Sequence, residues 1–209
     1  MFFIIFYLSK QIEIYLVIMF FAFIHELTHL LAGILLKMKV KRISIMPLGF
    51  SVEFAVLEEN YNKKILKSNI LEIKRIVIAI AGPLINLIIC LVASNLNIQY
   101  ELKNMIIYSN FLIAIFNLLP IYPLDGGRII KSILCIYIGR KNAIIISNKI
   151  SNITLFLISF LFSILTYAIK NIALVLILIY LWYIVIKENK IFKMKIKLYN
   201  MLEKNKQIQ

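Results

Sequence analysis

The stretch IYLVIMFFAFIHELTHLLAGILL occupies residues 14–36 and decides the class of this protein. It is long enough for a helix that crosses a bilayer, which needs about 20 mainly apolar residues. Polar side chains are costly inside such a helix, yet His25, Glu26 and His29 lie within about one turn of each other. The segment therefore predicts a membrane protein with a polar site inside the membrane.

The composition of the whole chain supports this class. Of the 209 residues, 62% are hydrophobic and 16% are charged, and the mean hydropathy is +0.90. A soluble domain is about 45–50% apolar and about 25% charged, and a chain this short could not bury the excess. A soluble enzyme, a disulfide scaffold and a disordered tail are excluded. The net charge of +14 comes from basic residues that flank apolar runs, so we expect no nucleic-acid partner.

The apolar runs predict an all-α polytopic membrane protein with about five to six transmembrane helices. Residues 38–57 differ, because their strand-like alternation around a Pro47-Leu48-Gly49 turn predicts a small membrane-associated β-hairpin. Residues 58–75 are charged and polar, which is typical of a loop or a surface helix. After the first span we expect transmembrane helices at about 76–96, 105–119, 152–169 and 172–186, and a further helical piece from Gly126-Gly127 to about 138.

The distribution of basic residues selects one topology. All but three of the 24 Lys and Arg residues fall in segments 37–75, 126–150 and 187–209. Since cytoplasmic loops carry the excess of Lys and Arg, we expect these segments to face the cytoplasm. The protein is therefore expected to be an integral, multi-pass membrane protein with its N-terminus outside and its C-terminus in the cytoplasm.

The HExxH motif at residues 25–29 predicts a zinc site. The spacing i, i+4 places His25 and His29 on one face of a helix, so that both imidazoles can bind one zinc ion. Glu26 is adjacent to the first ligand, and from there its carboxylate can reach a metal-bound water as a general base. These residue types in this order indicate a metallopeptidase.

A catalytic zinc usually has a third protein ligand and one open position. Asp125 is the natural candidate, because it is the only aspartate and the chain has no third histidine. It lies in NLLPIYPLDGG, at residues 117–127, where prolines and glycines unwind the helix and allow a carboxylate to turn inward.

Depth in the membrane supports this grouping. His29 lies seven residues before Leu36, about 10 Å from the cytoplasmic end of its helix. Asp125 follows a helix that travels towards the cytoplasm, and Gly82 and Asn86 lie early in a helix that leaves it. The topology rests on Lys and Arg alone, so the similar depth of these three clusters is an independent observation.

Three motifs together carry a family resemblance. They are HExxH at 25–29, Ala81-Gly82-Pro83-x-x-Asn86, and Asn117-x-x-Pro120-x4-Asp125-Gly126. They resemble the site-2 protease family of intramembrane zinc metalloproteases, over about residues 20–140. The stretch 117–127, with Lys41-Arg42 and Pro47-Leu48-Gly49 upstream, is most similar to the stage IV sporulation protein FB branch, whose members process pro-sigma-K in spore formers.

The resemblance implies a zinc metalloendopeptidase with one Zn²⁺ per chain, held by His25, His29 and Asp125, and with Glu26 as the catalytic base. Asn117 would help to hold substrate or the developing oxyanion, with an interhelical hydrogen bond as the alternative. Gly82 and Asn86 would contribute to the same binding, with close helix packing as the alternative. The 38–57 strands would lie near the site, where an exposed edge could pair with an extended substrate.

The resemblance also implies an organisation and a substrate. Residues 1–187 would form the protease domain, with a catalytic core at about 14–140, and residues 188–209 a basic cytoplasmic tail without a CBS domain. We expect cleavage of a membrane-associated regulatory protein near the cytoplasmic face, with pro-sigma-K as the first choice. An anti-sigma factor or a remnant signal peptide is the alternative. A regulatory or inhibitory membrane partner is left open, and the basic surface suits anionic lipids of the bilayer as well as an acidic partner.

Two other classes of function use the same residues. A metal transporter would bind ions through intramembrane His and Asp, but it would place polar residues on both sides of the midplane and would not need Glu26. A non-catalytic membrane scaffold would not need the complete set of ligands and base. The sequence favours the protease over both.

Overall fold

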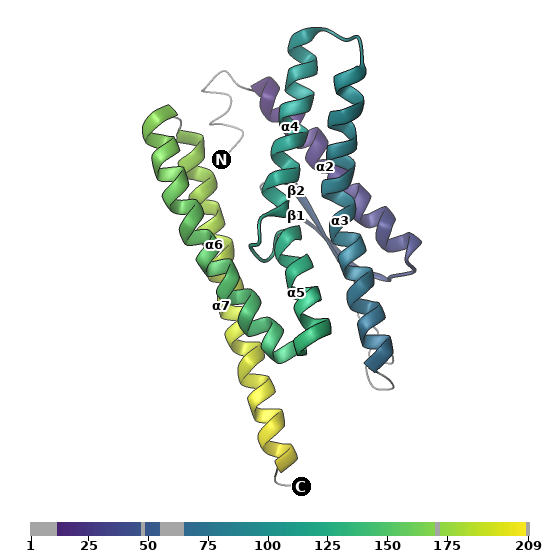
Figure 1. Cartoon of the computed structure of the whole chain (residues 1–209), viewed down its shortest axis with the longest axis vertical. Helices are drawn as coiled ribbons and strands as arrows, with labels where there is room; N and C mark the ends of the chain where they lie inside the picture. Colours follow the sequence, from purple (N-terminus) through teal and green to yellow (C-terminus); the bar gives the residue numbers. More distant parts are fainter. Residues whose placement is uncertain (1–11, 47–48, 55–64, 170–171, 208–209) are drawn as a thin grey trace. The chain divides into compact units, whose positions relative to one another are not determined.

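The computed structural model describes residues 12–46, 49–54, 65–169 and 172–207. It is mainly helical (Figure 1). It contains two compact units, which divide between Leu118 and Leu119. Within the described residues, three helices are long and apolar enough to cross a membrane, and they cover Glu13–Leu35, Asn69–Asn95 and Arg140–Ala168. The larger number of spans expected from the sequence stays a prediction.

The first unit is built from α2 (Ile12–Leu35), α3 (Ile65–Asn95) and α4 (Tyr100–Leu118), and each of these helices packs against the other two. Figure 1 shows α3 and α4 side by side, with α2 crossing them. Their outward faces carry exposed large apolar side chains such as Leu84, Leu91 and Leu112. This pattern suits a lipid environment, in which polar groups are expected to face the protein interior.

Polar contacts at the C-terminal end of α2 fix where this helix stops. Lys37 has a positive φ of 56°, and the N–H of Met38 donates to the carbonyl of Gly33 at 2.9 Å. Lys74 on α3 donates from Nζ to the carbonyl of Leu36 at 2.8 Å. A cation at this position satisfies a free carbonyl and interacts favourably with the negative end of the helix dipole.

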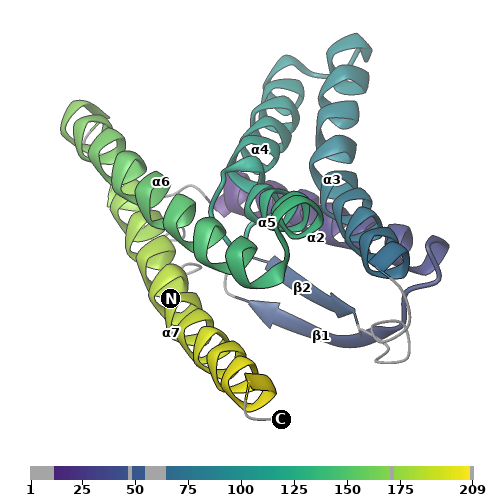
Figure 2. The same ribbon diagram turned by 60° about the horizontal axis from the view of Figure 1, so that its bottom comes forward.

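Two short strands follow α2. β1 (Val40–Met46) and β2 (Gly49–Phe54) pair antiparallel, with Met46 opposite Gly49. Figure 2 shows the two strands beside α2. The contact depends on Gly33, because a Cβ at this position would overlap the ring of Phe54. Residues 47–48 of the expected turn lie outside the described residues, and the association of the strands with the membrane stays a prediction.

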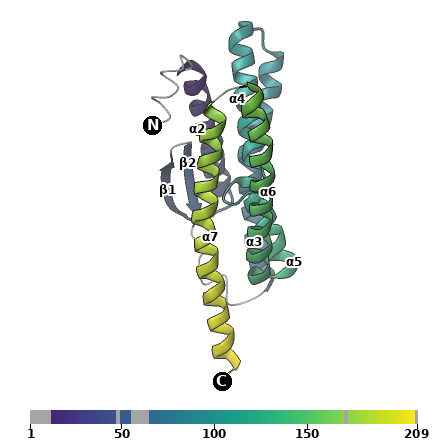
Figure 3. The same ribbon diagram turned by 90° about the vertical axis from the view of Figure 1, so that its left-hand side faces the viewer.

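The second unit contains α5 (Asp125–Ile138), α6 (Arg140–Ile169) and α7 (Ile172–Gln207). α5 packs against α6, and α6 packs against α7. Figure 3 shows α6 and α7 side by side, with α7 continuing to the C-terminus. Gly139 links α5 to α6 with a φ of 77°, a conformation that favours glycine.

Two helices are longer than the sequence led us to expect. α3 begins at Ile65, so residues 65–75, for which a loop or a surface helix was expected, are helical and continue into the span expected from about 76. Their charges fit this helix because Glu72 is buried and its carboxylate pairs with Arg75 at 2.8 Å. The tail expected from residue 188 is helical up to Gln207 and continues the preceding helix. No proline or glycine interrupts residues 172–207, so α7 continues through them.

The Gly33–Phe54 contact predicts the effect of a single methyl group. Gly33→Ala should lower stability by about 1–3 kcal/mol through overpacking, although alanine itself favours a helix by about 0.5–1 kcal/mol over glycine. In a Phe54→Ala background, the same substitution should be neutral or stabilising. Thermal unfolding of the four proteins in detergent checks this, and equal destabilisation in both backgrounds would contradict the contact.

Candidate metal centre

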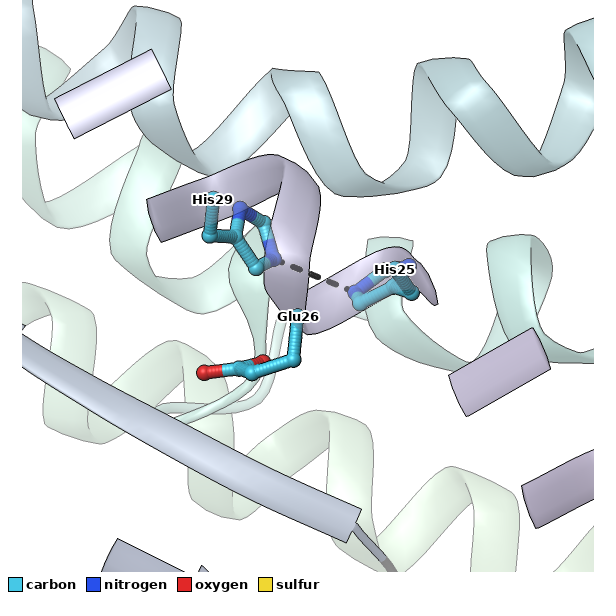
Figure 4. A group of neighbouring side chains, drawn as sticks. All are labelled: His25, Glu26 and His29. Carbon is cyan, nitrogen blue, oxygen red and sulfur yellow. Dashed lines mark hydrogen bonds between the residues drawn. The ribbon is translucent and has the colours of Figure 1, made fainter. Parts of the chain in front are cut away.

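His25 and His29 lie on successive turns of α2 and face the protein interior. Their side chains are only 4% and 2% exposed. Figure 4 shows the two imidazoles turned towards each other, with Glu26 extending from the same part of the helix. The two Nε2 atoms are 3.1 Å apart, and the rings are nearly perpendicular, at 89°. The predicted histidine pair is therefore assembled by one helix.

The remaining nitrogen of each ring has an acceptor. His25 Nδ1 donates to Oδ1 of Asn86 at 2.5 Å, and His29 Nδ1 donates to the backbone carbonyl of Ile78 at 2.7 Å. Because both acceptors are oxygens, the neutral rings carry their protons on Nδ1. Each Nε2 then presents a lone pair to the other, and such an arrangement is favourable when a cation bridges them.

The nitrogen geometry fits zinc. Zn–N bonds of 2.0–2.1 Å at a tetrahedral angle place two ligand nitrogens about 3.3 Å apart, close to the 3.1 Å between the two Nε2 atoms. Glu26 completes a group in which the potential ligand atoms all lie within 4.8 Å of one another. Its side chain is half-buried, and its carboxylate lies close to the two imidazoles. The arrangement suits two nitrogen ligands and an adjacent base.

Gly82 is the residue that lets α3 approach the two imidazoles. A Cβ at this position would lie 2.7 Å from Nε2 of His25 and 2.5 Å from Cε1 of His29. No side chain fits there without moving one of the two histidines. The structure thus supports close packing for Gly82, and its role in substrate binding stays a prediction.

Asn86 is fully buried one turn further along α3. Its amide oxygen accepts from His25, and its Nδ2 donates to Oδ1 of Asn110 at 2.7 Å. The described contacts of this amide are therefore with the metal centre and with α4. A direct contact of Asn86 with substrate or oxyanion stays a prediction.

Asn117 lies in the last turn of α4. Its Nδ2 donates to the backbone carbonyl of Ile113, four residues earlier, at 3.0 Å. This bond lies within one helix, so it is not the interhelical bond that the sequence left open. The expected role of Asn117 towards substrate stays a prediction.

Asp125 is the first residue of α5 and belongs to the second unit. Its carboxylate is buried, and Oδ1 lies 3.7 Å from Arg128 one turn later. A Cβ on Gly127 would overlap the backbone of Ile121 and Tyr122, so glycine allows the preceding loop to fold back over the start of α5. The structure thus places Asp125 at the junction of an unwound loop and a helix.

Side chains of α5, α6 and α7 hold this loop in place. The N–H of Tyr122 donates to Oγ of Ser151 at 2.9 Å. The Tyr122 ring lies 5.1 Å from that of Phe192, and the ammonium of Lys131 lies 4.2 Å from the Tyr122 ring centre. Hydrogen bonding and cation–π attraction thus constrain the segment just before Asp125.

Sequence reasoning missed three contributors to these sites. Asn110 carried a signal, because an amide in the apolar α4 segment is costly unless it is paired. Ser151 carried a weaker one, since serine is common in membrane helices. The carbonyl of Ile78 carried none, because only the packing of α3 on α2 makes this backbone group a partner of His29.

Comparison with known proteins settles the family. The profile of peptidase family M50 matches residues 13–101 and 93–162, which covers most of the chain. The chain belongs to this peptidase family. The M50 match spans both compact units and includes His25, His29 and Asp125.

Individual relatives agree with the M50 assignment. A zinc metalloprotease of Methanocaldococcus jannaschii is 31% identical over 182 residues, which cover 82% of this chain and 48% of the relative. Stage IV sporulation protein FB of Bacillus subtilis is 28% identical over 127 residues, or 59% of this chain and 41% of the relative. The chain thus spans less than half the length of both curated relatives.

A solved structure agrees with the fold. The site-2 protease from Methanocaldococcus jannaschii matches 85% of this chain and 78% of its own, with a TM-score of 0.58 and 23% identity. This likeness shows that the fold is that of a site-2 protease. The buried histidine pair of this M50 chain, and the zinc metalloprotease among its relatives, identify the metal as Zn²⁺.

The close approach of Gly82 to the two imidazoles predicts that a larger residue at position 82 lowers the affinity for zinc. Gly82→Ala should weaken zinc binding by about 10–100-fold, the range seen when groups around ligating histidines are altered. Competition with a chromogenic chelator measures this. Leu84→Ala, at an exposed position of the same helix, is the matched control and should bind as wild type. Unchanged affinity of Gly82→Ala would contradict the packing.

The hydrogen bond between Tyr122 and Ser151 predicts how fast the Tyr122 amide exchanges its hydrogen with solvent. Ser151→Ala removes the acceptor of the Tyr122 amide, which should then exchange its hydrogen about fivefold faster, because such a bond contributes about 1 kcal/mol. Hydrogen–deuterium exchange of the 119–125 segment measures this. Ser163→Ala, at an exposed position of the same helix, should leave the exchange rate of this segment at the wild-type value. Equal exchange rates in the two variants would contradict the prediction.

Proposed function

We propose that this protein is an intramembrane zinc endopeptidase that hydrolyses a peptide bond of a membrane-associated regulatory protein. The observation that carries the proposal is the histidine pair on α2, with both Nε2 atoms directed at one point and Glu26 beside it. Membership of peptidase family M50 gives this geometry its chemical context.

The proposed chemistry divides between the metal and Glu26. Zinc, when bound, polarises the scissile carbonyl and lowers the pKa of a bound water. Glu26 takes the proton of the attacking water and later delivers it to the leaving amine. His25 and His29 would bind through Nε2, because Nδ1 of each ring faces an oxygen acceptor, that of Asn86 or of Ile78.

Asp125 is proposed as the third ligand. Its support is chemical: Asp125 is a buried carboxylate at the start of α5, and Ser151 and Phe192 hold Tyr122 in the loop just before it, so the carboxylate is preorganised to bind a cation. Asn117 is proposed to help hold substrate or the developing oxyanion, as the family resemblance implies.

The proposed substrate is pro-sigma-K or a protein like it, processed during sporulation. Stage IV sporulation protein FB among the relatives supports this choice. An anti-sigma factor or a remnant signal peptide is the alternative substrate. The distribution of Lys and Arg supports a site that opens to the cytoplasm, so water and substrate would enter from that side.

The proposal predicts a separation of metal binding from catalysis. Glu26→Gln should keep zinc and lose cleavage by at least about 100-fold, since a general base contributes about 10²–10⁴-fold. Co-expression with tagged pro-sigma-K, followed by immunoblotting, measures cleavage, and zinc analysis of the purified protein measures the metal. Glu13→Gln, an exposed position in the first turn of the same helix, is the matched control.

The same experiment separates the alternatives. Asp125→Asn should lose both zinc and cleavage if this carboxylate is a ligand. Equal cleavage by wild type and Glu26→Gln would remove Glu26 as the base. Zinc binding without cleavage of pro-sigma-K, but with cleavage of an anti-sigma factor or a remnant signal peptide, would replace the sporulation substrate. Zinc transport into proteoliposomes without peptidase activity would overturn the proposal.

A further inference from the structure

Behind the metal centre lies a row of hydrogen bonds that continues into α4. His25 Nδ1 donates to Oδ1 of Asn86, Asn86 Nδ2 donates to Oδ1 of Asn110, and Asn110 Nδ2 donates to the carbonyl of Ile106 at 2.8 Å. Asn86 and Asn110 are both 0% exposed. Three helices of the first unit are thus joined by one row of buried polar groups.

All the hydrogen bonds of this row are donated in one direction, from His25 towards α4, and the carbonyl of Ile106 at its end sets that direction. The carbonyl of Ile106 can only accept, so the Nδ2 of Asn110 must face it and the Oδ1 of Asn110 must face Asn86. Asn86 must then present Nδ2 to Asn110 and Oδ1 to His25. Reversing either amide would bring two donors or two acceptors together in a buried site, which costs about 1–3 kcal/mol.

This direction matters for metal binding. An Asn86 amide turned the other way would present an N–H to Nδ1 of His25. The imidazole would then accept at Nδ1 and carry its proton on Nε2, the atom that faces His29. A protonated Nε2 cannot bind zinc, so the orientation of the two amides decides which tautomer His25 adopts.

We propose that Asn110 is a positioning residue of the zinc site, which locks the Asn86 amide so that His25 keeps its proton on Nδ1 and its lone pair on Nε2. The inference rests on the proposed zinc site and extends it to a residue on a third helix that does not touch the metal. His29 reaches the same tautomer without α4, through the carbonyl of Ile78.

Two substitutions at position 110 separate positioning from packing. Asn110→Leu has a similar size but removes the acceptor for Asn86. Asn110→Asp keeps an oxygen that accepts from Asn86 in either protonation state. We expect Asn110→Leu to weaken zinc binding by about 10–100-fold, and Asn110→Asp to remain close to wild type.

The matched control is a different contact between the same two helices. Cys90 Sγ on α3 donates to the carbonyl of Ile107 on α4 at 3.4 Å. Cys90→Ala removes this link without touching the row of amides. Zinc affinity is measured for the full-length proteins in detergent by chelator competition, alongside the Tm of each zinc-free protein. Cys90→Ala should keep wild-type affinity.

A second measurement needs no variant that could fail to fold. Nitrogen-15 NMR of the histidine side chains in zinc-free wild type should show His25 protonated on Nδ1. Protonation on Nε2 would overturn the proposal, as would equal zinc affinity of wild type and Asn110→Leu. Loss of affinity in both Asn110 variants together with Cys90→Ala would assign the effect to packing and also overturn it.

The outcomes separate this inference from the proposed function. If wild type binds no zinc, the metal centre itself fails. If wild type binds zinc and cleaves substrate while Asn110→Leu binds zinc equally well, only the positioning role fails.

Discussion

The first unit depends on one constraint, which is that two neutral imidazoles must present lone pairs to each other 3.1 Å apart inside an apolar helix. The other nitrogen of each ring then carries a proton, and a buried N–H is costly unless it has an acceptor. Both acceptors come from α3, so α3 must approach closely. Gly82 allows this approach, while Asn86 and Ile78 supply the oxygens.

The same constraint explains the distribution of polarity. The fully buried side chains of the first unit include Asn86 and Asn110, whereas large apolar residues such as Leu91 and Leu112 are exposed. This reverses the pattern of a soluble domain. In lipid, apolar residues need no burial, and the interior is where polar groups find partners. The buried amides therefore stabilise helix contacts that the hydrophobic effect alone would not specify.

In the second unit, the segment before the Asp125 carboxylate must also satisfy its polar groups. Asp125 needs an unwound segment before it, and an unwound segment leaves backbone groups without helical partners. Ser151 accepts from one of these groups, and the aromatic contact between Tyr122 and Phe192 holds the loop from the side of α7. The long C-terminal helix thus contributes to a loop that lies far from it in sequence.

Much of this arrangement was predictable from the sequence. HExxH on an apolar helix gave the histidine pair, because the spacing i, i+4 is a local property of any α-helix. Prolines and glycines marked the loop before Asp125 for an equally local reason. The limits of α3 and α7 were not predictable, because charged residues such as Glu72 and Arg75 resemble a loop until their pairing is known.

The sequence by itself determined the class, the pair of histidines on α2 and the carboxylate beside them, since these depend on composition and on spacing within one helix. Only the tertiary structure decided how the ligands are oriented. The carbonyl of Ile78, the amide of Asn86 and the more distant amide of Asn110 lie on other helices. Hydrogen bonds between distant residues form only where helices pack, and the packing is set by the whole unit rather than by any local pattern.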